Sequence, residues 1–188
     1  MIFAATEKLL ADVPLHDLSV ARVIAEAQVA RGTFYAYFES KYEVVAALMD
    51  EVMERMYGLL LPFVERKPGV SADAAIREVI TASAELWVEH RAVFRAAREH
   101  RHAVPELKAQ WLRVTERFTD AVAGELRREV AAGNAPSGRD ERQVASVLVW
   151  STEHLLYVAG WGADDALPDE RAIVDTVVGM WIGTLYRR

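Results

Sequence analysis

The residues best suited to chemistry lie close together in the segment Leu18–Lys41. At about 100° per residue, Phe34 and Phe38 fall on one face of a helix, which we expect to pack into the core. The rest of that helix carries small residues edged by hydroxyl groups and one cation: Arg31, Gly32, Thr33, Tyr35, Ala36 and Tyr37. Such a surface can enter the major groove of DNA, where flanking hydroxyls and cations reach phosphates.

The overall charge gives no support for nucleic-acid binding. The net charge is -6, and residues 1–41 hold four Lys or Arg against five Asp or Glu. A DNA-binding hypothesis therefore depends on where a few cations lie, such as Lys41 at the positive start of the next predicted helix, a favourable place for a phosphate. The pattern alone leaves two interpretations open: a helix pair that reads DNA, or an ordinary helix pair whose Phe34 and Phe38 are only core residues.

The elements that must position these residues are short helices. Ser19 is a predicted N-cap for a helix to about Ala27, and a second helix follows over about 30–38. Two short helices joined by a turn of three or four residues match the spacing of a helix-turn-helix. The run Ser40–Glu43 predicts a capping box that opens a long helix, which we expect Pro62 to end or kink.

Helical periodicity continues along the rest of the chain, and no segment alternates like a strand. We predict further helices over about 2–11, 71–90, Pro105 to about 131, 139–160 and 169–187, with breaks at Lys67–Gly69 and Gly133–Gly138 and a turn of mixed charge after residue 90. The expected fold class is all-α with about nine helices. It divides into a helix-turn-helix domain of three helices over 1–41 and a larger helical domain over 42–188.

The last two predicted helices are apolar on wide surfaces. The helix over 139–160 carries one stripe that includes Val147 and Leu148 and a second that includes Trp150, Tyr157 and Trp161. A helix with two apolar stripes must bury both, so one can face the core of the subunit while the other faces a second copy. The alternative is a single large core in a monomer.

Several function classes lack the residues that they need. The chain has no cysteine, and its five histidines form no pair at the i, i+4 spacing of a helical metal site. We find no phosphate loop, nucleophile elbow or HExxH motif, so we expect no catalytic residue, no metal and no cofactor. Uncharged apolar runs stay below about 18 residues and no signal peptide is recognisable, which predicts a cytoplasmic protein without a membrane span.

The segment Ile24–Lys41 resembles the signature of the TetR family of bacterial repressors, which reads IA..AGVS.GTFY.YF.SK. The matching residues are Ile24, Ala25, Ala27, Val29, Gly32, Thr33, Phe34, Tyr35, Tyr37, Phe38, Ser40 and Lys41. Two positions depart from it: Gln28 replaces the usual glycine of the turn, and Ala30 replaces a serine N-cap. Both departures affect the expected turn, because glycine eases a left-handed backbone and serine satisfies exposed amides.

The resemblance implies a homodimer, formed through the last two helices, that binds a double-stranded DNA operator and releases it on binding a small hydrophobic effector. We expect a roughly palindromic operator. Carried onto this sequence, the DNA-binding residues are Arg31, Gly32, Thr33, Tyr35, Tyr37 and Lys41, with Ser19 and Arg22 in reach of phosphates. Two alternatives remain: an all-helical enzyme that binds a small molecule, and an interaction module that binds no operator.

The C-terminal part is similar to the EthR-like branch of this family, which has an aromatic-lined tunnel. The similarity rests on Thr152-Glu153, Asp175-Thr176, Trp181 and Tyr186. Matched to that branch, the ligand-binding residues are Trp87, Trp111, Thr115, Phe118, Thr152, Tyr157 and Trp181. The alternative for these side chains is a solid aromatic core without a cavity.

Overall fold

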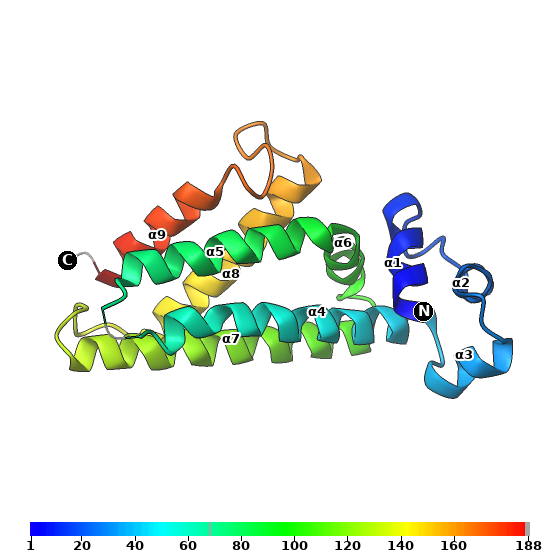
Figure 1. The fold of residues 1–188 in the computed structure, drawn as a ribbon, viewed down its shortest axis with the longest axis horizontal. Coiled ribbons are helices and arrows are strands. Elements are labelled where there is room, and N and C mark those ends of the chain that lie inside the picture. The colour runs from blue at the N-terminus through cyan, green and yellow to red at the C-terminus, as the bar shows by residue number, and fades with distance from the viewer. Residues whose placement is uncertain (68, 187–188) are drawn as a thin grey trace. The chain divides into compact units, whose positions relative to one another are not determined.

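The computed structural model describes residues 1–67 and 69–186, and every regular element in that part of the chain is an α-helix. The helices are α1 (Ile2–Asp12), α2 (Val20–Ala27), α3 (Arg31–Tyr37), α4 (Lys41–Val64), α5 (Ala72–Glu89), α6 (Arg91–His100), α7 (Pro105–Ala131), α8 (Glu141–Trp161) and α9 (Val174–Tyr186) (Figure 1). The prediction of an all-α fold with an N-terminal helix-turn-helix is confirmed.

These helices form two compact units. The headpiece unit comprises Met1–Glu54 and His90–Arg113, so it contains α1–α3, the first half of α4, α6 and the start of α7. The body unit comprises Arg55–Glu89 and Val114–Arg188, with α5, α8, α9 and the remainders of α4 and α7. The two long helices therefore contribute to both units.

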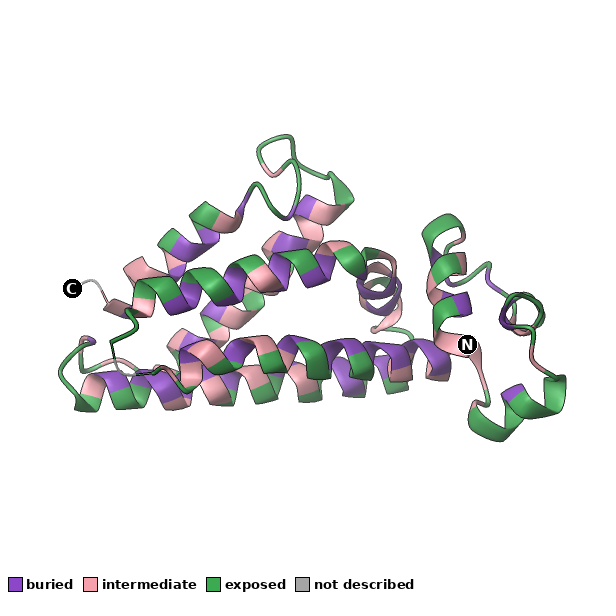
Figure 2. Ribbon diagram, viewed as in Figure 1, coloured by how far each residue is buried: buried purple, intermediate pink, exposed green. Residues whose placement is uncertain are grey.

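The core of the headpiece unit is small and apolar. Leu10, Leu18, Val23 and Phe34 are almost completely buried. Figure 2 shows buried segments on α1 and α3. Phe38 is half-buried, with its ring centroid 6.0 Å from that of Phe34. The face predicted to pack inward from α3 is therefore the face that packs inward.

Side-chain caps begin the helices at the predicted residues. The Ser19 hydroxyl oxygen accepts the N–H of Arg22 at 3.3 Å, and the Ser40 hydroxyl oxygen accepts the N–H of Glu43 at 3.2 Å. The second half of the capping box differs from the prediction, since the Glu43 carboxylate accepts the N–H of Glu39 at 2.7 Å. Glu43 therefore bonds to the backbone of Glu39, one residue before Ser40, whose N–H the motif predicts as the donor.

The segment after residue 90, predicted as a turn of mixed charge, instead contains α6. Its apolar residues Val93, Phe94, Ala96 and Ala97 are buried at helical spacing. The four charged side chains at Arg91, Arg95, Arg98 and Glu99 lie outside this buried set. The prediction was wrong because the high density of charge concealed a narrow apolar stripe.

Two helix boundaries also differ from the prediction. Helix α9 begins at Val174 and not at 169, because the Asp169 carboxylate accepts the N–H groups of Arg171 and Ala172 at 2.8 and 2.9 Å and holds a turn there. Helix α4 continues to Val64, two residues beyond Pro62. The predicted break at Lys67–Gly69 includes Pro68, and the predicted last helix includes residue 187; both lie outside the described residues.

In the body unit, α5 packs against α8 and α9, and α8 packs against α9. Ile76, Leu148, Val177 and Leu185 are almost completely buried among these helices. An ion pair at the surface joins α5 to the α8–α9 loop, since the Arg171 guanidinium donates to both Glu85 oxygens at 2.7 and 2.6 Å. This hydrogen bond lowers the pKa of the Glu85 carboxylate.

Candidate DNA-binding surface and ligand site

The turn between α2 and α3 is left-handed at the residue that departs from the family signature. Gln28 has φ 53° and ψ 41°, and it is the one non-glycine residue with positive φ in the part of the chain that the structure describes. A side chain with a Cβ is strained in this conformation, whereas glycine adopts it freely. Ala30, the N-cap of α3, provides no side-chain hydrogen bond to the helix. Both departures from the signature therefore make the turn less stable, Gln28 through backbone strain and Ala30 through the missing cap.

The predicted DNA-binding residues of α3 form an exposed surface. Tyr37 is 73% exposed and Tyr35 is 45% exposed, and Arg31, Gly32 and Thr33 are also exposed. The Arg31 guanidinium lies over the Tyr35 ring, 5.4 Å from its centroid. A Cβ added at Gly32 would meet no atom within 4 Å, so nothing inside the protein requires a glycine there. Its small size is available for the close approach of a partner.

The start of α2 presents two more of the predicted residues. Ser19 and Arg22 are both exposed. The Ser19 oxygen accepts the Arg22 N–H, and its own hydroxyl proton can still donate to a phosphate. Side chains at a helix N-terminus also benefit from its positive dipole when the partner is an anion.

Lys41 has a structural role that sequence reasoning missed. Its Nζ donates to the carbonyl oxygens of His16 and Leu18, both at 2.8 Å, and so ties the loop before α2 to the start of α4. Burial lowers the pKa of the Lys41 ammonium, while the nearby Asp17 carboxylate raises it in part. An ammonium group has three N–H donors, so one remains for a phosphate beside the two carbonyls.

The structure brings two of the predicted ligand-binding residues into direct contact. In the body unit, the indole N–H of the buried Trp181 donates to the hydroxyl of Thr152 at 2.8 Å. The Trp181 ring also meets the ring of Phe63 edge-on, with centroids 6.0 Å apart. A polar contact of this kind between α8 and α9 fixes the orientation of the indole within apolar surroundings.

The other predicted ligand-binding residues have different environments. Trp87 and Thr115 are buried in the body unit, and the rings of Phe118 and Tyr157 lie 5.6 Å and 5.7 Å from those of Tyr57 and Trp161. Trp111 belongs to the headpiece unit, where the Arg101 guanidinium lies 4.6 Å from its ring centroid. Six of the seven residues therefore share one compact unit.

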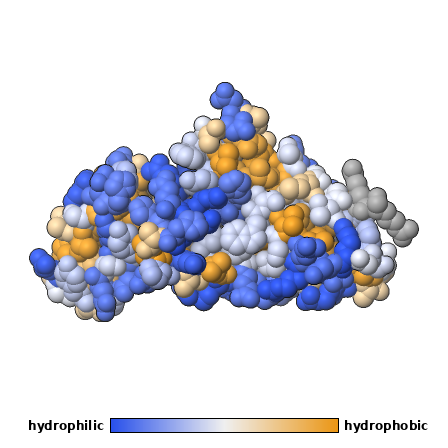
Figure 3. All heavy atoms as spheres, turned by 180° about the vertical axis from the view of Figure 1, so that it is seen from behind, coloured by the Kyte–Doolittle hydropathy of each residue, from blue (hydrophilic) through white to orange (hydrophobic). Residues whose placement is uncertain are grey.

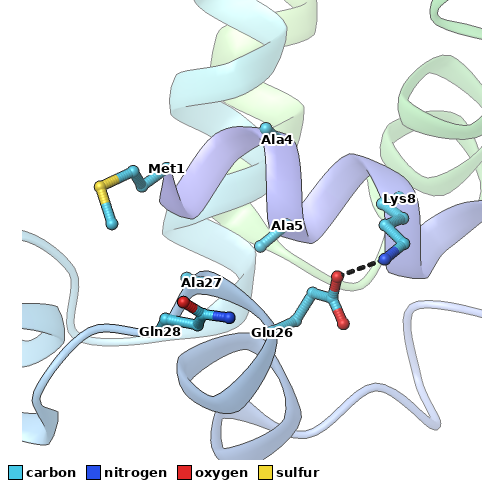
Figure 4. Close-up of a pocket in the computed structure, with 7 residues that line it drawn as sticks. All are labelled: Met1, Ala4, Ala5, Lys8, Glu26, Ala27 and Gln28. Carbon is cyan, nitrogen blue, oxygen red and sulfur yellow. Dashed lines mark hydrogen bonds and ion pairs between the residues drawn. The ribbon is translucent and has the colours of Figure 1, made fainter.

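A surface recess of about 280 Å³ lies between α1 and α2 and was not foreseen from the sequence (Figure 4). Three of its seven lining residues are alanines, Ala4, Ala5 and Ala27, whose pattern carries no signal of a site. Lys8 and Glu26 form an ion pair at 2.5 Å at its edge, and this hydrogen bond raises the pKa of Lys8.

A buried polar cluster in the body unit also escaped sequence reasoning. Arg66 donates to Glu129 at 2.5 Å, and both side chains are largely buried. Burial raises the pKa of the Tyr186 hydroxyl, and its hydrogen bond with Arg66 lowers that pKa in part. Residues 63 or more positions apart make these contacts, so no local pattern could have revealed them.

Neither a membrane-spanning helix nor a metal-binding cluster is found among the described residues. No helix there has both the length and the hydropathy required to cross a membrane. No group of three or more His, Asp or Glu side chains there is arranged to hold a metal ion.

Comparison with known families identifies the two parts of the chain. Residues 2–48 match the model of bacterial regulatory proteins of the tetR family, and residues 76–187 match the model of the C-terminal domain of the transcriptional regulator EthR. The chain belongs to the TetR family. Its C-terminal domain is of the EthR type, as the resemblance through Thr152-Glu153 and Trp181 implies.

Individual relatives agree with the family assignment. The HTH-type transcriptional regulator EthR of Mycobacterium tuberculosis is 29% identical over 185 residues, which cover 98% of this chain and 85% of the relative. EthR of Mycolicibacterium smegmatis is 27% identical over 98% of this chain and 84% of the relative. The solved structure of FadR from Bacillus subtilis in complex with stearoyl-CoA has a TM-score of 0.80 at 20% identity and covers 98% of both chains, so it shares the fold.

The family assignment addresses one of the two alternatives that the sequence left open, the all-helical enzyme. The chain is a transcriptional regulator of the TetR type with a DNA-binding helix-turn-helix and a ligand-binding type of C-terminal domain. Its relatives are regulators and not enzymes, so the alternative of an all-helical enzyme is rejected.

Proposed function

We propose that this regulator is a repressor that binds a palindromic DNA operator as a homodimer and releases it when a small hydrophobic effector binds. The observation that carries the proposal is the exposed surface of α3, where Tyr35 and Tyr37 flank small residues in a chain whose remainder matches an EthR C-terminal domain. A regulator of this bacterial family reaches its DNA in the cytoplasm, which is the location that this proposal gives the protein.

The DNA-binding domain in this proposal is residues 1–41, and residues 42–188 bind the effector and the second subunit. Gly32 and Thr33 face the bases, because a small surface allows α3 to lie deep in the major groove. The remaining contacts go to phosphates and fix the register: Ser19, Arg22, Arg31, Tyr35, Tyr37 and Lys41.

Exposed apolar side chains on α8 support dimerisation through α8 and α9. Val147 is 56% exposed and Trp161 is 60% exposed, and Trp150 lies on the exposed side with them. Figure 3 shows hydrophobic patches separated by paler residues on the face opposite that of Figure 1. On α9, a Cβ added at Gly179 or Gly183 would meet no atom within 4 Å, so a second helix can approach closely there. A second copy would bury this surface and place two α3 helices on successive major grooves.

The aromatic residues of the body unit support an elongated apolar effector. The proposed lining within this unit is Trp87, Thr115, Phe118, Thr152, Tyr157 and Trp181, whereas Trp111, predicted with them from the sequence, belongs to the headpiece unit. Aromatic walls with a few hydroxyls favour an uncharged chain, because a buried charge would need a partner. FadR from Bacillus subtilis, which shares the fold, was solved with stearoyl-CoA, a long-chain acyl compound.

Effector binding would act on DNA affinity by a population shift. A ligand that fits better when the two DNA-binding domains are spread apart stabilises that state, and by linkage DNA weakens the ligand equally. A coupling of about 1–3 kcal/mol corresponds to a change in operator affinity of about 5- to 150-fold.

Selection of duplexes from a random library by the wild-type protein tests the first part of the proposal. We expect enrichment of one roughly palindromic sequence, and Thr33→Ala should relax the preference at particular base pairs while it leaves the salt dependence unchanged. If no sequence is enriched and binding is absent at low salt, the chain acts as an interaction module and the proposal is wrong.

Titration of the selected duplex complex with stearoyl-CoA and with uncharged long-chain compounds tests the second part. We expect at least one of them to raise the melting temperature and to release the DNA. Trp181→Ala should weaken both effects together, because the indole is part of the proposed lining. Compounds that raise the melting temperature without any change in DNA affinity would contradict the coupling.

A further inference from the structure

Helix α6 is part of the headpiece unit and is attached to it at both ends. At its start, the His90 ring N–H donates to the Glu7 carboxylate of α1 at 2.5 Å. At its end, the His100 ring lies 6.1 Å from that of His16, in the loop before α2, and 6.3 Å from that of Tyr42, at the start of α4. α6 and α1 lie side by side in Figure 1, in agreement with their contacts. The end of α6 therefore borders the residues that precede α2 and begin α4.

The two segments of the headpiece unit have opposite charge. Residues 1–54 hold four Lys or Arg and nine Asp or Glu, whereas residues 90–113 hold six Lys or Arg, two Asp or Glu and three of the five histidines. Two of the four cations in the first segment are already engaged, since Lys8 pairs with Glu26 and Lys41 donates to carbonyl oxygens. Affinity for duplex DNA depends mainly on cations at phosphates, and the helix-turn-helix segment is poor in them.

Within residues 90–113, the turn from α6 to α7 and the first turn of α7 follow this border directly along the chain. Arg101 stacks on Trp111 and Arg113 donates to Gln110, so these two side chains have structural partners. His102 and Lys108 are exposed. His102 is two residues beyond His100, hence at most about 7 Å from it along the chain. Lys108 lies in the first turn of α7, where its N–H donates to Val104 O at 3.0 Å.

We propose that the α6–α7 turn and the first turn of α7 form a second DNA-backbone contact, in which His102 and Lys108 bind phosphates that flank the site read by α3. The proposal rests on the proposed function of the helix-turn-helix, and it adds a contact that lies far from that motif in the sequence. The positive charge of residues 90–113 complements the DNA backbone and offsets the acidic residues of the first segment. The contact carries no base specificity, so it strengthens binding to every sequence.

The test compares substitutions of opposite charge in the same turn. Lys108→Gln should lower affinity for a selected duplex of about 30 base pairs and reduce the slope of log affinity against log salt by about 0.9 for each lost contact. This slope corresponds to a loss of about tenfold near 50 mM salt and of about fourfold near 200 mM. His102→Gln should act in the same direction with a smaller effect, and Glu106→Gln, at an exposed acid of the same turn, should raise affinity.

The controls separate a phosphate contact from a purely structural role of the turn. Arg127→Gln removes an exposed cation from the body unit and should leave the salt slope unchanged. A structural role would make Lys108→Gln and Glu106→Gln weaken binding alike, which would overturn the proposal. Wild-type binding with an unchanged slope in Lys108→Gln would also overturn it while the proposed function stands. Failure of the wild type to bind any duplex would instead reject the function itself.

Discussion

The headpiece unit and the body unit differ in how the ends of their helices are satisfied. In the headpiece unit, Gln28 takes the left-handed position at the end of α2, and Ala30 leaves α3 without a side-chain cap. In the body unit, Asp140 caps α8 through the N–H of Gln143 at 3.0 Å, and a glycine takes the left-handed position at its end. The short helices α2 and α3 thus retain local costs at their ends that the longer helix α8 avoids.

This difference agrees with the tasks proposed for the two units. A segment that must fit against DNA and respond to a ligand is expected to come from the less stable part of a protein, whereas the part that holds the subunits together needs firm packing. The exposed surfaces of the two units also differ in polarity. α3 exposes the tyrosines Tyr35 and Tyr37, which have polar ends, whereas α8 exposes Val147 and Trp161.

The largest effect is expected from charges placed on the apolar surface of α8. The double substitution Val147→Glu with Trp161→Glu should convert the proposed dimer into monomers, because two buried carboxylates would have no partners. Operator affinity should then fall by about 100-fold or more, since one α3 helix holds only a half-site. Sedimentation at micromolar concentration measures the first result. Thr81→Glu, at an exposed position of α5 and therefore outside the proposed interface, is the control. A dimer that survives the double substitution contradicts the assignment.

A smaller loss is expected at Lys41, the residue that joins the loop before α2 to α4. Lys41→Met removes hydrogen bonds to two carbonyl oxygens and one cation, so the free energy of unfolding should fall by about 1–2 kcal/mol. DNA affinity should fall by about tenfold near 50 mM salt if the third N–H binds a phosphate. Denaturant unfolding and salt titration separate these two contributions. Lys67→Met, at an exposed lysine of the body unit, should change neither.

Removal of the unpaired hydroxyl in the headpiece core should instead stabilise the protein. Thr6 is 0% exposed, and its hydroxyl lacks a partner among the described residues. Thr6→Val keeps the shape of the side chain and removes the buried polar group, so the free energy of unfolding should rise by about 1–2 kcal/mol. Thr6→Ser keeps the hydroxyl, loses the methyl group and should destabilise. A lower melting temperature for Thr6→Val would show that the hydroxyl is satisfied in solution.

The smallest effect is expected in the turn of the helix-turn-helix. Gln28→Gly relieves the left-handed strain but adds freedom to the unfolded chain, so the net gain should be about 0.5–1 kcal/mol. The same change at Gln143, within helix α8, should cost about 1 kcal/mol. Thermal unfolding of the two variants measures the contrast. Equal losses at both positions would mean that Gln28 is not left-handed in solution.

Most of the local structure could be predicted from the sequence, because its causes lie within a few residues of each other. The Ser19 and Ser40 caps act over three residues, and the inward face of α3 follows from Phe34 and Phe38 four residues apart. The family signature is equally local, since its residues lie within Ile24–Lys41. The exposure of Tyr35 and Tyr37 then follows from the side of the helix that the phenylalanines leave open.

Only the tertiary structure decided the contacts between distant segments. Lys41 meets the carbonyl of His16, 25 residues away, and Trp181 meets Thr152, 29 residues away, although no spacing in the sequence pairs them. The inclusion of residues 90–113 in the headpiece unit has the same origin, because it depends on His90 and His100 meeting residues of α1, of the loop before α2 and of α4. Periodicity determines which face of a helix is buried, but the partner of that face is selected by the packing of the whole chain.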